Sequence, residues 1–506
     1  MWVTKSRHLL PRRYWLDIDL PLVCLHCSHG SSTVPHLPRT IVIVGAGFSG
    51  AAVAINLLRL SYWRPVRIVL VDRTPRMARG AAYAERSHPY LLNVPAGRMS
   101  MNSADPLEFL KFAQQRLPDA TADDFLPRSL YGDYLESVLF EAEQASPSHV
   151  QLHKVVGQIC AIERTGGTSP YRVEFDDGTS FIADDVVLAL GNPPPANLPG
   201  TESLRGSPRY VADPWSSPPA LKPGETALVI GTGLTMADTV IAGSEAANDE
   251  VTFHAISRHG MIPPSQTAFR TGPGCDGDDA ALLRAASFSA RRLLHAVREL
   301  TDDVQRRGGD WREAITCVRT LAPSLWQRLP TRERQRFLRH ARPYWDVHRH
   351  RLPQQTLAKL EQLQRNEKLH VHAGRLVKFE LVGEQIRVSW RTRGGSEIQT
   401  MLVDRVINCT GADYNPVRSS DRLMRSLLGG GLVAPDSLGL GLRTGAHGAV
   451  IDSRNRPATN LYYIGPMLRA DHWECTAAQE LRTHAERLAH HLAAPAVKPM
   501  FAVRRA

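Results

Sequence analysis

The sequence is poor in cysteine and lacks any long uncharged apolar run. Its seven cysteines are scattered over 506 residues, too few and too far apart for the disulfide framework of a secreted scaffold. A reducing compartment is therefore expected, and we predict a cytoplasmic location. No stretch of about 18 uncharged apolar residues occurs, so no membrane partner is expected. A nucleic-acid motif and a basic block interleaved with aromatic residues are also lacking, so no nucleic acid is expected to bind.

The composition is that of a globular protein. Hydrophobic residues make up 43% of the chain and charged residues 22%. At roughly 100–200 residues per domain, the length predicts two or three domains. Lys and Arg number 61 against 50 Asp and Glu, and the net charge of +11 favours anionic partners. Because the arginines are spread along the chain, small anions such as dinucleotides are favoured over a polyanion.

Residues 1–39 precede the first patterned strand and are expected to be a flexible extension. An apolar stretch there is similar to a signal peptide, but Asp17 and Asp19 interrupt its start, so secretion is not expected. Cys24 and Cys27 have the spacing of half a zinc site. Since no second pair of this spacing completes the site, no metal is predicted.

The clearest chemical signal is a glycine turn between a strand and a helix. Residues 40–44 are β-branched, and Gly45, Gly47 and Gly50 follow before an Ala- and Leu-rich helix. In this pattern the first glycine permits a tight turn, the second lets backbone approach a pyrophosphate, and the third lets helix and strand pack closely. The next strand ends at Asp72, whose carboxylate can accept hydrogen bonds from a ribose. The predicted dinucleotide contacts are Gly45, Ala46, Gly47, Phe48, Ser49, Gly50 and Asp72.

A second glycine turn follows the strand at 227–230. Its predicted dinucleotide contacts are Gly231, Thr232, Gly233 and Leu234. The next strand ends before Arg258 and has no acid in the ribose-binding place. A guanidinium there suits a 2′-phosphate, so the site is predicted to prefer NADPH over NADH. The alternative for Arg258 is a solvated surface arginine.

Two dinucleotide sites in one chain predict a tightly held flavin beside a nicotinamide that supplies hydride. We therefore expect FAD as one cofactor and NADPH or NADH as the other. Three further strands end at glycines that let backbone pass close to a cofactor, and these are Gly191, Gly411 and Gly465. Beyond Gly465 the chain leads into a helix near Glu480, whose N-terminal dipole is expected to face the flavin pyrimidine ring.

The predicted fold class is α/β, with two Rossmann-like domains. An FAD-binding domain of residues 40–220 and 403–490 is split by an NAD(P)-binding domain of residues 221–402. Apolar residues at helical spacing over about 278–366 predict a mostly helical insertion in the second domain. Residues 491–506 are predicted to be a C-terminal tail.

Several motifs lie between and after the glycine turns. They are Gly80-Ala-Ala-Tyr83, Leu91-Leu-Asn93-Val-Pro95-Ala-Gly-Arg98-Met99-Ser100, Asp105-Pro106, Phe125-Leu-Pro-Arg128, Tyr131-Gly-Asp-Tyr134, residues 343–349, and the tail from Gly465 to Glu480. With them the chain, over about residues 40–490, resembles the two-dinucleotide-binding flavoproteins. That group includes flavin-containing monooxygenases, N-hydroxylating monooxygenases and disulfide reductases. The chain is most similar to the FAD/NAD(P)-binding family that contains FAD-dependent urate hydroxylases and aspartate N-monooxygenases. Disulfide reduction is not expected, because no cysteine lies between Cys27 and Cys160 and the only Cys-x-x-Cys pair precedes the first nucleotide strand.

The resemblance implies that the segment after Asp72 wraps the flavin. It implies FAD or active-site contacts for Tyr83, Asn93, Arg98, Met99 and Ser100. The Asn93 amide can donate and accept at the ring edge, and Met99 offers an apolar face. The alternative for Met99 is core packing. Arg98 is either a clamp on a phosphate or an anionic substrate, or a solvated arginine.

Cations and aromatics crowd into residues 339–351 at the end of the insertion. Such a cluster can bind a flat anion by stacking and bidentate hydrogen bonds. The alternative is a charged helix end that closes the insertion onto the rest of the protein. Arg342, His348 and, near the last strand, His472 are the substrate candidates.

The predicted activity is an NAD(P)H-consuming, FAD-dependent monooxygenation of a small polar anion by O2, through a flavin hydroperoxide. Because the cofactor carries this chemistry, no catalytic acid or base is assigned, and His472 and Glu474 are candidates by position alone. Urate is the first choice of substrate, since the resemblance includes urate hydroxylases, and it would place the enzyme in purine metabolism. The alternatives are aspartate N-hydroxylation, an NAD(P)H:acceptor reductase that inserts no oxygen, and a flavin-dependent regulator without turnover.

Overall fold

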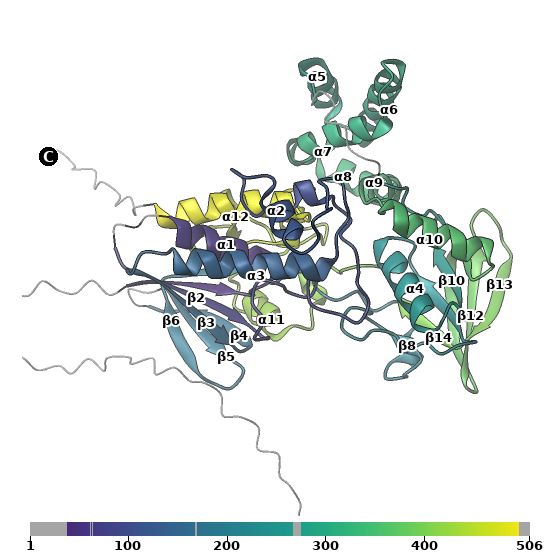
Figure 1. Cartoon of the computed structure of the whole chain (residues 1–506), viewed down its shortest axis with the longest axis horizontal. Coiled ribbons are helices and arrows are strands. Elements are labelled where there is room, and N and C mark those ends of the chain that lie inside the picture. Colours follow the sequence, from purple (N-terminus) through teal and green to yellow (C-terminus); the bar gives the residue numbers. More distant parts are fainter. Residues whose placement is uncertain (1–37, 61, 63, 167–169, 267–274, 495–506) are drawn as a thin grey trace, which may run out of the picture. The chain divides into compact units, whose positions relative to one another are not determined.

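The structure, a computed structural model, describes residues 38–60, 62, 64–166, 170–266 and 275–494 (Figure 1). Over these residues the chain forms two large sheets that contain parallel strands, one small antiparallel sheet and the helices around them. This confirms the α/β fold class. Cys24 and Cys27 lie outside the described residues.

The first glycine turn belongs to a six-stranded sheet of order β15-β16-β7-β1-β2-β3. β1 is parallel to both of its neighbours, and Val44 lies opposite Val71 of β2 and Leu188 of β7. Since β15 and β16 come from near the end of the described chain, strands far apart in sequence share this sheet. The strands are β1 (Arg39–Val44), β2 (Val66–Asp72), β3 (Val150–Val156), β7 (Asp185–Leu188), β15 (Ala449–Ile451) and β16 (Pro457–Tyr463).

Both faces of this sheet are buried, as a parallel sheet requires. Ile41 and Ile43 of β1 pack into the core under the helices, whereas Val42 and Val44 pack into the core on the other face. Three helices cover the first face, namely α1 (Phe48–Arg59), α3 (Arg128–Gln144) and α12 (Ala478–Ala493), with α2 (Glu108–Gln114) beside α3. The second face carries an antiparallel sheet of β4 (Ile159–Arg164), β5 (Tyr171–Phe175) and β6 (Ser180–Ala183), and α11 (Arg422–Gly429).

The second glycine turn belongs to a seven-stranded sheet of order β13-β12-β11-β10-β9-β14-β8. Its strands are β8 (Tyr210–Val211), β9 (Thr226–Ile230), β10 (Thr252–Ser257), β11 (Leu369–Val382), β12 (Gln385–Thr392), β13 (Ile398–Val403) and β14 (Arg405–Asn408). β14 pairs in parallel with β9, and Val406 lies opposite Leu228. The strand at 405–408 is therefore part of the second sheet, although the predicted boundary at 403 assigns it to the first domain.

Helices fill the chain between β10 and β11, which confirms the mostly helical insertion. They are α5 (Gly277–Ala286), α6 (Ala290–Arg306), α7 (Trp311–Arg328), α8 (Thr331–His340), α9 (Arg342–Arg349) and α10 (Gln354–Arg365). Leu283, Leu300 and Leu325 of α5, α6 and α7 share a small core of their own. α10 instead packs on α4 (Leu234–Ala246), with Leu360 buried in the core of the second sheet.

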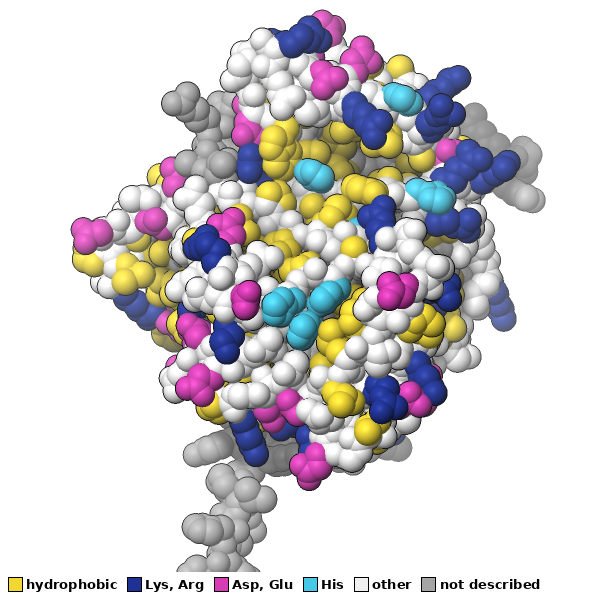
Figure 2. Space-filling model, turned by 90° about the vertical axis from the view of Figure 1, so that its right-hand side faces the viewer, with side chains coloured by type: hydrophobic (Ala, Val, Ile, Leu, Met, Phe, Trp, Pro, Cys, Tyr) yellow, Lys and Arg dark blue, Asp and Glu magenta, His cyan; other side chains and the backbone are white. Residues whose placement is uncertain are grey.

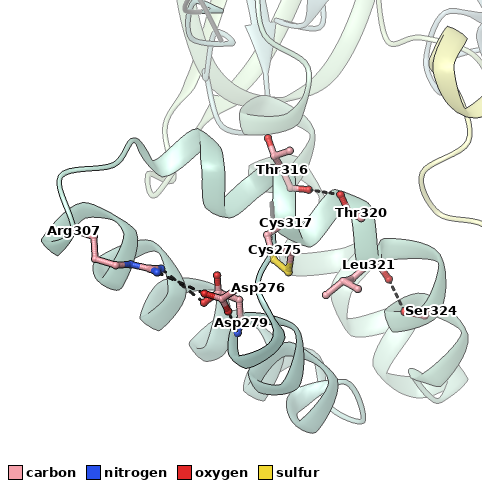
Figure 3. Close-up of a disulfide and its surroundings, with 9 residues drawn as sticks. All are labelled: Cys275, Asp276, Asp279, Arg307, Thr316, Cys317, Thr320, Leu321 and Ser324. Carbon is pink, nitrogen blue, oxygen red and sulfur yellow. Dashed lines mark hydrogen bonds and ion pairs between the residues drawn. A yellow bond between two sulfur atoms is a disulfide. The ribbon is translucent and has the colours of Figure 1, made fainter. Parts of the chain in front are cut away.

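A disulfide joins Cys275 to Cys317, 42 residues apart (Figure 3). Cys275 precedes α5 and Cys317 lies on α7, so the bond ties the start of the insertion to its third helix. Disulfides are rare in reducing compartments. The pair therefore departs from the expectation, based on cysteine number and spacing, that the cysteines stay reduced. No helix of the described chain combines the length and the apolar composition that a membrane crossing needs.

Candidate functional site

Two glycines of the first turn are required by the turn itself, and the third leaves space. Gly45 has a φ of +100°, and a Cβ there would lie 2.3 Å from the carbonyl oxygen of Ala189. A Cβ on Gly50 would lie 1.9 Å from the carbonyl oxygen of Gly45. The nearest neighbour of a Cβ on Gly47 would be the Cα of Gly80 at 3.4 Å, an ordinary contact. Gly47 thus leaves the backbone open at the N-terminus of α1, where helix dipole and N–H groups suit a phosphate.

Asp72 braces the same turn. Its Oδ2 accepts a hydrogen bond from the backbone N–H of Ala46 at 2.8 Å, and its Oδ1 accepts two from Thr74 at 3.0 and 2.9 Å. An ionised carboxylate has about four lone-pair positions, so one remains for a ribose hydroxyl. The predicted ribose acid therefore lies against the glycine turn.

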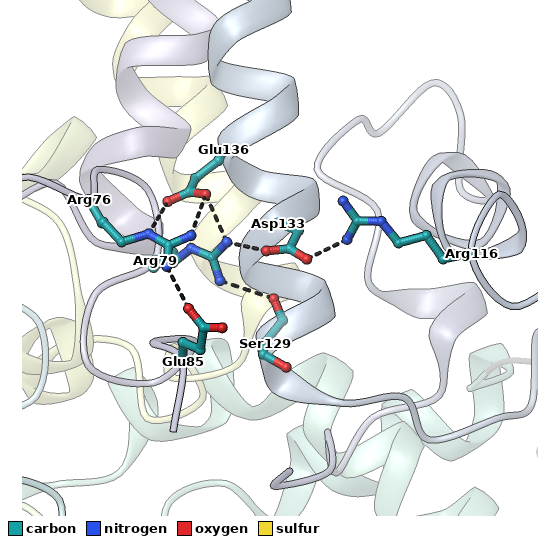
Figure 4. A network of polar contacts seen from close by, with 7 residues as sticks. All are labelled: Arg76, Arg79, Glu85, Arg116, Ser129, Asp133 and Glu136. Carbon is teal, nitrogen blue, oxygen red and sulfur yellow. Dashed lines mark hydrogen bonds and ion pairs between the residues drawn. The ribbon is translucent and has the colours of Figure 1, made fainter. Parts of the chain in front are cut away.

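An ion network holds the segment after β2 on α3 (Figure 4). Arg79 is 3% exposed, and its guanidinium contacts Asp133 and, at 2.8 Å, Glu136. Gly80 and Tyr83 follow Arg79 directly along the chain. The network therefore fixes the backbone of the segment that approaches the glycine turn and supplies Tyr83.

A cavity of about 280 Å³ lies beyond this segment. Four residues predicted to contact the flavin line it, namely Tyr83, Asn93, Arg98 and Met99. The remaining lining includes Ile315, Thr316 and Arg319 on α7, Arg349, His350 and Arg351 at the end of α9, and Thr476, Ala477, Ala478 and Gln479 at the start of α12. Segments from the first domain, the insertion and the last helix thus meet at one cavity.

Tyr83 and Met99 join the cavity to the core of the first domain. The Tyr83 ring centroid lies 4.8 Å from that of Tyr131 and 6.3 Å from that of Phe48. Burial raises the pKa of Tyr83 to about 12, so its phenol stays protonated at neutral pH. Met99 is 3% exposed and packs in the core while it also lines the cavity. Met99 therefore packs in the core, and its contact with the flavin stays a prediction.

The cavity is lined by five arginines and no acid: Arg98, Arg128, Arg319, Arg349 and Arg351. Three of them meet carboxylates behind the lining. Arg319 contacts Glu480, Arg349 donates from Nε to Oε2 of Glu474 at 2.8 Å, and Arg128 donates to Asp238 of α4 at 2.9 Å. The pair of Arg128 and Asp238 also links the first domain to the first helix of the second.

Burial and mutual repulsion lower the pKa of several cavity groups. Burial, followed by neighbouring guanidinium groups, lowers the pKa of Arg351 to about 10. Burial and then the charge of Arg349 lower the pKa of His350 to about 3, so this imidazole is neutral at pH 7. Burial and the charge of Arg319 lower the pKa of Arg98. The cavity is therefore an electropositive environment that favours anions.

Glu474, a candidate from the sequence, has both carboxylate oxygens engaged. The indole N–H of Trp345 donates to Oε1 at 2.8 Å, and Arg349 donates to Oε2. Glu474 is 5% exposed and does not line the cavity. His472 also lies outside the lining, and its ring centroid is 5.0 Å from that of His484. The contacts of Glu474 make it a positioning residue for α9.

The substrate candidates on α9 point elsewhere. Arg342 pairs with Asp346 at 3.1 Å, and Nδ1 of His348 lies 2.7 Å from the carbonyl oxygen of Tyr344. Neither lines the cavity, which is reached by residues 349–351 at the end of the same helix. Their substrate roles stay predictions. The cluster at 339–351 was the signal that pointed to this segment, but it did not separate the residues that reach the cavity from those that do not.

Three further predicted cofactor contacts lie outside the cavity lining. The buried Oγ of Ser100 lies 2.9 and 2.6 Å from the carbonyl oxygens of Asn102 and Asp105, which share its single proton. Gly411 and Gly465 follow β14 and β16 with φ values of +82° and +139°. Their contacts with a cofactor stay predictions.

The second glycine turn repeats the logic of the first. Gly231 has a φ of +115°, and a Cβ there would lie 2.5 Å from the carbonyl oxygen of Cys409, whereas the space around Gly233 is open to 4 Å. The Thr232 hydroxyl hydrogen bonds with that of Ser257 at 2.9 Å. Leu234 then begins α4.

Arg258 lies in a second pocket, of about 200 Å³, with three further arginines. They are Arg375 of β11, Arg391 of β12 and Arg393 after β12. Within the described chain none of the four has a carboxylate within ion-pair distance, although Arg393 donates to the Tyr344 hydroxyl at 3.5 Å. β10 and β11 are parallel neighbours, so their ends bring these cations together where a ribose phosphate is expected. We call this group the arginine pocket. The face shown in Figure 2 carries both basic and acidic side chains, and Lys and Arg are densest at its upper right.

Comparisons with known proteins agree with this geometry. Residues 42–193 match the family of FAD-NAD(P)-binding domains. A search of curated proteins by sequence finds no match.

Among solved structures, ornithine N-hydroxylase of Kutzneria sp. 744 with reduced FAD, NADP⁺ and L-ornithine has a TM-score of 0.59 and 14% identity, covering 90% of this chain and 99% of that one. L-lysine 6-monooxygenase of Pseudomonas syringae has a TM-score of 0.60 and 16% identity, covering 90% and 99%. The cadaverine monooxygenase of Erwinia amylovora, bound to FAD, has a TM-score of 0.60 and 12% identity, covering 90% and 94%. At these identities the likeness shows the fold. Residues 42–193 therefore match a family described as FAD-NAD(P)-binding, and the chain as a whole shares its fold with these solved monooxygenase structures.

Proposed function

We propose that the protein is an FAD-dependent monooxygenase that consumes NADPH and O2 to hydroxylate a small anionic substrate. The observation that carries the proposal is the composition of the cavity. The residues predicted to contact the flavin form one part of its lining, and arginines from α7 and α9 form another.

The residues present suit FAD. Gly47 leaves room at the N-terminus of α1 for the pyrophosphate, and Asp72 keeps an acceptor for the ribose. Tyr83, Asn93 and Met99 would hold the ring system in the cavity. When bound, FAD supplies the oxygen-activating chemistry. The chain's own task is to orient the substrate and to exclude water, and the half-buried lining from α7, α9 and α12 would contribute to both.

NADPH is favoured over NADH as the reductant. The arginine pocket offers four guanidinium groups beside the end of β10, and a 2′-phosphate would bind them through charge-assisted hydrogen bonds. The hydroxyl of an unphosphorylated ribose would leave these cations unneutralised. Gly231, Thr232 and Gly233 would hold the pyrophosphate of the same dinucleotide at the start of α4.

The charge of the cavity supports a substrate of another kind than those named for the structural neighbours. Those names refer to ornithine, lysine and cadaverine, whose terminal amines are cations at neutral pH. This cavity presents no carboxylate to receive such an amine, because Glu474 and Glu480 are engaged by arginines behind the lining. An anion is therefore the better fit. Urate is our first choice and L-aspartate the second.

The test is turnover by the purified full chain. If the protein binds FAD, it must be yellow, either as isolated or after incubation with FAD. Urate or L-aspartate should stimulate NADPH oxidation with an equal consumption of O2 and formation of hydroxylated product. NADPH oxidation coupled to artificial acceptors, with no oxygenated product from any anion, would identify a reductase instead. Colourless protein that takes up no FAD would contradict both.

We also propose that the enzyme works in the cytoplasm, on the basis of its low cysteine content. The Cys275–Cys317 bond opposes this, because cytoplasmic thiols are normally reduced. Thiol labelling of these two cysteines in freshly lysed cells, with and without prior reduction, tests the location. Labelling without reduction would agree with a cytoplasmic enzyme.

A further inference from the structure

Arg351 lines the cavity and forms no ion pair with a described residue, although the charge of Asp310 opposes the lowering of its pKa. Its Nε and Nη1 atoms are buried and have no hydrogen-bond partner. Its nearest recorded aromatic contact is Trp311, whose ring centroid lies 5.8 Å from the guanidinium carbon. Arg319 and Arg349, which line the same cavity, differ because they contact Glu480 and Glu474.

The position of Arg351 is fixed by its surroundings. The next residue, Leu352, is 2% exposed and its N–H donates to the carbonyl oxygen of Pro264 at 3.0 Å. Two residues before it, Arg349 is held by Glu474. The backbone at 351 is therefore held on both sides, and Nε and Nη1 of the guanidinium are buried at the end of this fixed backbone.

A buried cation with open donors is unfavourable unless an anion meets it. Burial lowers the pKa of Arg351 to about 10, so the group still carries its charge at pH 7. The charges of Arg319 and Arg349 also repel it. The carboxylates near these two arginines, Glu480 and Glu474, are engaged by them. A ligand with one delocalised negative charge would supply the missing acceptor atoms.

We propose that Arg351 determines substrate specificity by receiving the anionic group of the substrate, a planar monoanionic group such as a carboxylate or the urate ring. This inference rests on the proposed function, because it takes the cavity as the substrate site. The planar guanidinium can donate two parallel hydrogen bonds to such a group. An ammonium group would find only like charges there.

The test measures binding rather than turnover. The FAD-loaded, oxidised full chain is titrated in low-salt buffer with urate, L-aspartate and benzoate, and with cadaverine as the cationic probe. Isothermal titration calorimetry gives each Kd. The variants are Arg351→Gln, which removes the charge, and Arg351→Lys, which keeps it but loses the paired donors. Arg306→Gln is the matched control, since Arg306 has a side chain 71% exposed on α6 and undergoes the same charge change.

The wild type should bind at least one of the three anions and bind cadaverine more weakly. Arg351→Gln should raise the Kd of that anion roughly 10- to 100-fold, and Arg351→Lys should fall between Arg351→Gln and the wild type. Arg306→Gln should stay within about twofold. Flavin absorbance and the thermal melting temperature show whether each variant is folded. If Arg351→Gln does not fold, the binding test is made with Arg351→Lys alone.

Three results would overturn the inference: no binding of any of the anions to the wild type, tighter binding of cadaverine than of all three, or unchanged anion binding in both folded variants. If the third result comes with a raised Kd for NADP⁺, titrated in the same way, Arg351 belongs to the nicotinamide site instead. Failure of the proposed function is separate. If the anion binds through Arg351 but no hydroxylated product forms, the anion site stands and the monooxygenase does not. If hydroxylated product forms from a substrate whose Kd is unchanged by the Arg351 substitutions, the monooxygenase stands and the anion site at Arg351 does not.

Discussion

Arg349 donates a hydrogen bond from Nε to Oε2 of Glu474 at 2.8 Å, across 125 residues of sequence. The two side chains are 12% and 6% exposed. The pair joins the end of α9, in the insertion, to the segment that leads into α12 of the first domain. Because Arg349 engages the Glu474 carboxylate, this carboxylate is not part of the cavity lining.

Glu474→Gln should lower the free energy of unfolding by about 3 kcal/mol, because it leaves a buried guanidinium without its counter-charge. Urea denaturation followed by circular dichroism measures the effect. Glu85→Gln is the control, since Glu85 pairs with Arg76 on the surface with side chains 73% and 51% exposed. Such a pair contributes about 0–1 kcal/mol. Equal losses in the two variants would show that Glu474 is not held as described.

Gly45→Ala and Gly47→Ala should fail in different ways. Alanine at 45 requires a positive φ and meets the carbonyl oxygen of Ala189, so this variant should lose several kcal/mol of stability. Alanine at 47 fits the folded chain but fills the space proposed for the pyrophosphate. Gly47→Ala should therefore stay folded by circular dichroism and lose the flavin absorbance at least in part. Full FAD content in folded Gly47→Ala would remove that glycine from the cofactor site.

Arg258→Ala and Arg393→Ala should each raise the KM for NADPH about tenfold and leave the KM for NADH nearly unchanged, because each removes a partner of the 2′-phosphate. Steady-state assays with both nucleotides measure this. Arg387→Ala is the control, since Arg387 is exposed on the same strand as Arg391 but does not line the pocket. Equal changes for NADPH and NADH would assign the arginine pocket to another role.

Stability should fall as the pH drops below 7. Burial lowers the pKa of His350 to about 3 from an ordinary value of 6.5, so the unfolded chain takes up a proton before the folded one does. The stabilisation is present above pH 6.5 and is lost as the pH falls towards 3. By linkage this residue contributes up to about 2 kcal/mol of the loss between pH 7 and pH 5.

His350→Gln should make that pH dependence shallower, as measured by urea midpoints at pH 7, 6 and 5. A decline should remain, because burial also lowers the pKa of His254 and His484 to about 4 each. His340→Gln, at an exposed position, is the control. If the His350→Gln curve matches the wild type at every pH, His350 is not a buried neutral imidazole.

Reduction of the Cys275–Cys317 disulfide should destabilise the insertion by up to about 4 kcal/mol, because the bond closes a loop of 42 residues. Cys317→Ser should show the same loss without reductant, and the loss should not grow when Cys275→Ser is added. Thermal melts with and without dithiothreitol measure both. Additive effects of the two substitutions would mean that the cysteines act separately.

Much of the fold could be predicted from short segments of the sequence. A pattern of about a dozen residues is enough to predict each glycine turn. The tight turn, the close approach of backbone and the packing of helix on strand all need small residues at set spacing. The helical insertion was readable from its apolar periodicity. The sheet to which residues 405–408 belong could not be predicted in this way. Nothing within this strand indicates that it pairs with β9, nearly 180 residues earlier.

The sequence by itself thus determined the two dinucleotide turns, the class of fold and the segment that supplies arginines to the cavity. Only the tertiary structure decided which arginines those are. Arg342 and Arg351 lie in the same cationic cluster, yet Asp346 pairs with the first, while the second is carried into the cavity by the contacts of its neighbours with Glu474 and Pro264. In the same way Arg258 gains Arg375, Arg391 and Arg393 as neighbours because β10 and β11 pair across more than a hundred residues. Local patterns set backbone conformation, but the charge of a site depends on which distant side chains meet there.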